Sequence, residues 1–117
     1  MSAESELRAL LVAAAGVTAL VGTRVRAERA EQSDARPFVV FSRTGTDIEQ
    51  SLFDEVLGTK AVFEVACWAD NRASAEAVAD AVQTALVADH RAINSRAGGY
   101  DGDLDLEVAV LSVDWWD

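Results

Sequence analysis

Three aspartates near the C-terminus are the first candidates for chemistry. Asp101, Asp103 and Asp105 alternate with other residues, as in the D-x-D-x-D start of a calcium-binding loop. Such a loop needs glycine at its sixth position and glutamate at its twelfth, whereas these positions hold Leu106 and Ser112. The pattern therefore predicts a row of acids on the solvent face of a strand and no metal site.

Three other candidates for a catalytic or binding site are equally incomplete. Asp89 and His90 are adjacent, so they do not face each other on a helix, and no nucleophile motif lies near them. We expect His90 in the last turn of a helix, where the dipole favours a cation. Gly98-Gly99 lacks the lysine and the helix start of a phosphate loop. Cys67 lies on the apolar face of an expected strand and is predicted to be a core thiol.

The composition predicts one domain without a cofactor. A chain of 117 residues, half of them hydrophobic, is long enough for one packed core. We therefore expect a single domain over residues 1–117. One cysteine and one histidine exclude an intrachain disulfide and a Cys/His zinc cluster. We expect no catalytic residues, no cofactor and no metal, and therefore no enzyme.

The net charge and the hydropathy pattern restrict the partners. Ten basic and twenty acidic side chains give a formal net charge of -10, which opposes binding to nucleic acid and to anionic membranes. The longest uncharged run, residues 9–23, is shorter than the ~20 residues of a membrane span. It follows Glu4 and Glu6, where a signal peptide would be basic. We expect a soluble protein made in the cytoplasm, with no membrane partner.

Two principal helices are expected. The first is capped by Ser2, and its apolar face consists of Leu7, Leu10, Leu11 and Ala14. Gly16 interrupts this face, and residues 17–21 form a further short helical turn. The second helix is capped by Asp70 or Asn71. Its buried stripe consists of Ala75, Val78, Ala79, Val82, Ala85 and Leu86.

Two strands and a hairpin tip are expected between these helices. Residues 38–41 are apolar at every position, which is typical of a strand covered on both faces. Residues 44–47 are turn-like or a frayed continuation of that strand. Residues 59–68 alternate clearly, with Ala61, Phe63, Val65 and Cys67 on one face. The segment between them, residues 48–58, is long enough for a protruding hairpin tip.

The remaining strands complete the expected fold class. Val25 starts a brief extended piece, residues 91–93 form a short strand, residues 96–99 form a turn, and residues 104–115 form a final strand. This order lacks the regular spacing of βαβ units. The prediction is an α+β fold with a mainly antiparallel sheet of four to five strands and the two principal helices packed on one face.

Two apolar features are candidates for contacts with other proteins. Trp115 and Trp116 are consecutive, so on a strand they point to opposite faces, and one of them either covers the second face of the sheet or contacts another subunit. The hairpin tip carries apolar side chains among acidic ones, and exposed apolar groups often mark a partner surface. The apolar residues of the tip are Ile48, Leu52, Phe53, Val56 and Leu57.

The order of short apolar blocks along nearly the whole chain carries a family resemblance. The first helix ends in VTALVGTRV (residues 17–25), RPFVVF (36–41) and VFEVACWA (62–69) follow, and the second helix contains AEAVADAV (75–82). This arrangement resembles the tail-completion or tail-terminator proteins of long-tailed phages and related gene-transfer particles. The resemblance extends from about Leu7 to Trp115 and is weakest at residues 48–58 and 93–103.

The resemblance implies a structural subunit of a virion tail. Such a subunit forms a ring, usually sixfold, at the head-proximal end of the tail. There it ends polymerisation of the tail tube protein and contacts the head-side connector protein. The resemblance carries over no catalytic residue. It also gives the acidity a role, because a lumen rich in Asp and Glu repels phosphates and lets DNA pass without specific binding.

Two other functions remain open from the sequence. The chain is alternatively a connector or stopper component of the same particle, which a pull-down with tube protein against portal-side proteins would distinguish. It is also alternatively a small cellular ligand-binding or regulatory domain, which would need a concave pocket with convergent polar groups. A thermal-shift screen with a strong hit to one metabolite would favour that last function.

Overall fold

The computed structural model describes residues 2–29, 35–50 and 56–116, which form a five-stranded sheet and three helices. The strand order is β1-β2-β3-β5-β4. All neighbouring strands are antiparallel except β1 and β2, which are parallel. The predicted α+β class with a mainly antiparallel sheet is confirmed. The strands are β1 (Val25–Ala27), β2 (Phe38–Gln50), β3 (Val56–Ala69), β4 (Ala92–Asp101) and β5 (Leu106–Trp116).

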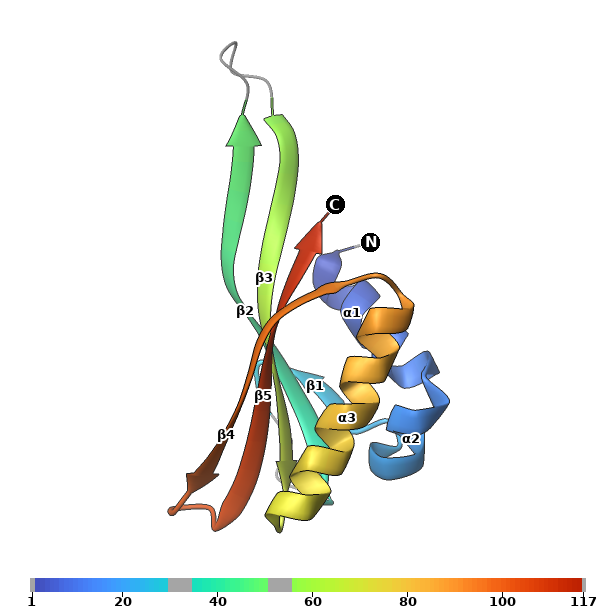
Figure 1. Cartoon of the computed structure of the whole chain (residues 1–117), viewed down its shortest axis with the longest axis vertical. Helices are drawn as coiled ribbons and strands as arrows, with labels where there is room; N and C mark the ends of the chain where they lie inside the picture. Colours follow the sequence, from blue (N-terminus) through green and yellow to red (C-terminus); the bar gives the residue numbers. More distant parts are fainter. Residues whose placement is uncertain (1, 30–34, 51–55, 117) are drawn as a thin grey trace.

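The helices lie on one side of the sheet (Figure 1). They are α1 (Ala3–Ala13), α2 (Ala15–Val21) and α3 (Arg72–Ala88), and α2 is the further short helical turn that was expected at residues 17–21. The helical path breaks at Ala14, whose backbone is extended, and α2 ends at Gly22 with φ 60°. The side chain of Asn71 accepts a hydrogen bond from the N–H of Ser74, which makes Asn71 the cap of α3. None of the described helices is both long and apolar enough to cross a membrane.

The core lies between the helices and one face of the sheet. The side chains of β3 that were predicted to face inward, from Ala61 to Cys67, are all buried. Phe63 stands at the centre, with T-shaped contacts to Phe41 and Trp115 at centroid distances of 6.2 and 6.3 Å. Every buried residue in the described part of the chain is apolar. The hydrophobic effect therefore fixes which face of each strand the helices cover.

The prediction of a turn at residues 96–99 was wrong, because these residues lie inside β4. Gly98 pairs with Ala109 and Gly99 with Val108 of β5. Glycines favour turns but also form ladder hydrogen bonds when a neighbouring strand is available. Arg96 adds an attachment to the helix layer, because its guanidinium donates hydrogen bonds to side chains of α3. The acceptors are Glu76, Asp80 and Gln83.

Strands β2 and β3 extend well beyond the rest of the sheet (Figure 1). Residues 44–47 continue β2, with an irregularity between Arg43 and Gly45, and the pairing reaches Gln50 opposite Val56. On the other side of β3, pairing with β5 stops where Lys60 meets Trp116. We call residues 48–50 and 56–59 the arm. It is a two-stranded ribbon, and it confirms that the chain protrudes at this position.

Candidate assembly surfaces

Asp103 and Asp105 lie in the turn between β4 and β5, and Asp101 is the last residue of β4, so the aspartates do not form a row on the solvent face of a strand. The Asp101 carboxylate accepts hydrogen bonds from the N–H groups of Asp103 and Leu104, at 3.0 and 3.2 Å. Asp105 has φ 53° and accepts a hydrogen bond from the Tyr100 hydroxyl at 2.7 Å. The strand prediction was wrong because Asp side chains bond to nearby backbone and tolerate the left-handed region. Among the described residues, no group of three or more His, Cys, Asp or Glu side chains could hold a metal ion.

Asp89 and His90 end α3 and do not form an acid–base pair. The Asp89 carboxylate pairs with Arg91, whose Nε lies 2.9 Å away. His90 is exposed and has φ 59°, just after the helix, so its expected place at the helix C-terminus is confirmed.

Cys67 is a core residue, as predicted. Its side chain is fully buried, and this burial raises the pKa of the thiol to about 12. The thiol therefore stays protonated at neutral pH, and the protonated form is a poor nucleophile.

The two tryptophans have different environments. Trp115 is 1% exposed, its Nε1 donates a hydrogen bond to Glu6 at 3.0 Å, and the Arg91 guanidinium lies 3.6 Å from its ring centroid. Trp115 therefore joins β5 to α1 inside the subunit, and we do not retain it as an interface residue. Trp116 is 45% exposed, and Lys60 Nζ lies over its ring at 5.6 Å from the ring centroid. Of these two consecutive tryptophans, Trp116 is the one whose indole is exposed.

The arm carries three of the five predicted tip residues. Ile48 lies in β2, where it pairs with Thr59, and Val56 and Leu57 begin β3. Leu52 and Phe53 lie outside the described residues.

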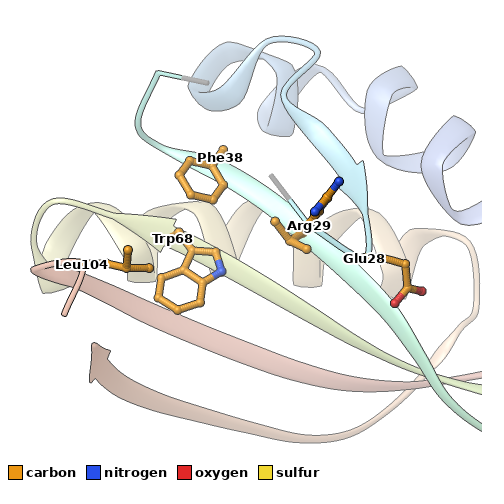
Figure 2. Close-up of a pocket in the computed structure, with 6 residues that line it drawn as sticks. Glu28, Arg29, Phe38, Trp68 and Leu104 are labelled. Atoms are coloured by element: carbon orange, nitrogen blue, oxygen red, sulfur yellow. The ribbon is translucent and has the colours of Figure 1, made fainter. Parts of the chain in front are cut away.

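The face of the sheet opposite the helices is only partly apolar, and we call it the bare face. Near the start of β2 and the end of β3, Phe38, Val40 and Trp68 line a cleft of about 220 Å³ together with Leu104 from the β4–β5 turn. Figure 2 shows the Phe38 and Trp68 rings side by side on neighbouring strands, with Glu28 and Arg29 at the other rim. The described walls are apolar, with charged groups only at the rim.

This cleft corrects the prediction that residues 38–41 are covered on both sides. Val39 and Phe41 are buried beneath the helices, whereas Phe38 and Val40 are half-buried on the bare face. The cleft is not apparent from the sequence, because Leu104 reaches it from a turn far along the chain. The apolar residues at every position of 38–41 did indicate that this face is apolar. An apolar strand of this kind is usually packed on both faces, and the described part of the subunit packs against only one.

A comparison with protein families identifies the family of this chain. The family model described as "Tail completion protein gp17" matches residues 5–116. The chain belongs to this tail completion protein family. No match was found among the curated proteins. A search of solved structures found similarity to a chain of the virion of a native gene transfer agent particle. Its TM-score is 0.67 at 22% identity, and the match covers 92% of this chain and 88% of the other.

Membership of the tail completion protein family gives these surfaces a context. The chain is a structural component of a phage-like tail, as the resemblance in the sequence predicted. Such a component works through contacts with other proteins of the particle. Trp116 and the cleft are exposed apolar features that could take part in such contacts, and the arm protrudes from the sheet (Figure 1).

Proposed function

We propose that this chain forms a ring at the head-proximal end of a phage-like tail. In this function the ring ends polymerisation of the tail tube and joins the tail to the head connector. Membership of the tail completion family supports the proposal. The observation that carries it is the arm, beside which the described residues place neither a helix nor a third strand (Figure 1).

The arm needs a partner for a physical reason. A two-stranded ribbon alone is marginally stable in water, because it buries too little apolar surface to offset the entropy of ordering its backbone. A ribbon that projects from one subunit gains the missing surface when it lies on a neighbour or on the tube. The apolar side chains at positions 48, 52, 53, 56 and 57 would provide that contact.

Trp116 and the cleft suit contacts between different parts of neighbouring subunits. Trp116 is opposite Lys60 on β3, and the cleft is at Trp68, eight residues further along the same strand. A ring uses a different surface on each side of its subunit, because each copy contacts one neighbour ahead and one behind. Two separate apolar sites meet this requirement, and tryptophan is enriched in interface cores.

The charge of the chain suits a ring through which DNA passes. At a net charge of -10 per subunit, a sixfold ring carries a large negative field. Acidic side chains along the lumen would repel phosphates, so DNA would slide without being held. A ring structure with a basic lumen and its acids on the outer rim would contradict this part of the proposal.

Electron microscopy of tails tests the function directly. Particles made without this protein should have tails of variable, excessive length that do not join heads, and supplying the protein should restore one length. Tails of unchanged length without the protein would reject the terminator role. A pull-down separates the neighbouring role: binding to tube protein supports termination, and binding to portal-side proteins alone supports a connector or stopper.

A further inference from the structure

Two edges of the sheet border no strand within the described residues. One is β4, which is the last strand in the order on its side. The other is the outer edge of β2 beyond Phe41, because β1 pairs only with residues 39–41. The last hydrogen bond on that side runs from the Glu28 N–H to the Phe41 carbonyl at 2.8 Å. Residues 92–101 and 42–50 thus form two open edges on opposite sides of one sheet.

The β4 edge lacks most features that protect natural edges from pairing. Protected edges carry Lys, Pro or bulges. Residues 92–101 contain neither Lys nor Pro, and the one irregularity lies near the start, between Ile93 and Ser95. The following stretch of Ala97, Gly98 and Gly99 has almost no side-chain volume. Another backbone can therefore approach this edge closely.

The same edge is held in place by the helix layer. Arg96 bonds to the side chains of Glu76 and Asp80 on α3. Arg72 crosses over Gly98 to reach Glu107 at 3.2 Å, and a Cβ added at Gly98 would lie 1.8 Å from the Arg72 Nη1. These attachments order β4 before any partner arrives, which lowers the entropy lost on pairing.

The directions of the two edges are compatible. β2 is antiparallel to β3, β3 to β5, and β5 to β4, so β4 runs antiparallel to β2. A second copy placed beside the first in the same sense would present its β2 antiparallel to β4. In a pair of subunits joined in this way, one β2 edge and one β4 edge stay free at the two ends. A further subunit can therefore join through the same contact. Repetition of one heterologous contact is what closes a ring.

We propose that the outer edge of β4 pairs antiparallel with residues 42–50 of β2 from a second copy of this chain. The pairing is the contact that builds the ring, so it rests on the proposed function. It extends the sheet from subunit to subunit and supplies the arm with a third strand from the neighbour.

Disulfide trapping tests the pairing. The variants Ala97→Cys on β4 and Gly45→Cys on β2 place thiols at exposed positions on the bare face, and the native Cys67 is buried. After mild oxidation we expect covalent dimers only when the two variants are mixed, and a ladder of multimers from the double variant. Further cysteine variants at Ser42 on β2 and at Ser95 or Gly99 on β4, which lie on the same face, complete a small grid that finds the register. Oxidation is carried out on the protein alone and on the protein bound to isolated tail tubes.

The outcomes separate this inference from the function on which it rests. Homodimers of the Ala97→Cys variant alone would show a twofold β4–β4 contact and overturn the inference. Rings seen by microscopy without any mixed disulfide in the grid would overturn it and leave the ring intact. Failure to form any oligomer, alone or on tubes, would overturn the inference and the ring together.

A lysine at the edge provides a second, independent test. Ala97→Lys should weaken self-association at least about tenfold, because lysine at an edge opposes strand addition. The matched control is Ala77→Lys, an exposed position on α3 away from both edges. Both variants should unfold at the temperature of the parent protein. Normal assembly of a folded Ala97→Lys variant would overturn the inference, and if that variant unfolds, the disulfide grid decides.

Discussion

The two faces of β3 show how differently one strand can be used. Phe63 and Val65 point into the core and are fully buried, whereas Val62 and Ala66 point to the bare face and are half-buried. Towards its start the same strand leaves the sheet and forms half of the arm. The buried face holds the subunit together. The bare face gains less from the subunit itself, and we propose that its apolar residues and the arm are covered by a partner.

The largest effect should come from the buried face. Phe63→Ala removes a side chain that contacts both Phe41 and Trp115. The free energy of unfolding, measured in urea, should therefore fall by about 3–5 kcal/mol. Val62→Ala, one residue away on the bare face, is the matched control and should cost less than about 1 kcal/mol. Equal losses would mean that the two faces do not differ in this way.

A smaller loss is expected at the attachment of β4 to α3. Arg96→Ala removes the hydrogen bonds to Glu76, Asp80 and Gln83, and should cost about 1–2 kcal/mol in urea unfolding. The control is Arg36→Ala, because its ion pair with Asp70 is exposed at both ends and should contribute less than about 0.5 kcal/mol. If both substitutions cost the same, the attachment is no stronger than a surface ion pair.

Cys67 should make the stability of the buried side sensitive to high pH. Its folded pKa, about 12, lies above the ordinary value of 9.0, so the unfolded chain loses the proton first. The contribution of the protonated thiol to the free energy of unfolding is fully present below pH 9. It declines as the pH rises towards 12, and the loss is roughly 1 kcal/mol at pH 10. The difference in the free energy of unfolding between the parent protein and the Cys67→Ala variant, measured in urea, should become smaller over this pH range. Rapid reaction of the native thiol with a disulfide reagent at pH 8 would show that Cys67 is not buried.

The smallest effect on unfolding is expected in the arm. Replacing Phe53 and Leu57 with Ser should change the free energy of unfolding by less than about 0.5 kcal/mol, while tail capping in electron micrographs is lost. A substitution of Glu49 by Gln in the same arm is the control and should cap normally. Unfolding of the double variant would instead assign the tip to the core of the subunit.

Local patterns were sufficient for the helices and the central strands. The apolar stripe of α3 and the alternation of β3 follow from periodicities of 3.6 and 2 residues, which the backbone itself imposes. The same periodicity separates Trp115 from Trp116. Membership of a tail completion family was also predictable, because the order of apolar blocks survives in the sequence.

The errors fall where distant residues decide local structure. Gly98 and Gly99 read as a turn because glycine permits one, and the presence of β5 beside them makes a strand. Asp101 and its neighbours read as a strand because they alternate, and bonds from the Asp101 carboxylate to backbone N–H groups make a turn. In both cases a hydrogen-bonding partner outweighed the local preference.

The sequence alone thus determined the class of fold, the buried faces of its main elements and the absence of a complete catalytic motif. These properties depend on side-chain types at fixed local spacings. Only the tertiary structure decided which of Trp115 and Trp116 is exposed. It also decided that Leu104 joins Phe38 and Trp68 at one cleft, and that β4 and β2 form open edges of the described sheet. Such features depend on which segments become neighbours, and neighbours are set by the packing of the whole chain.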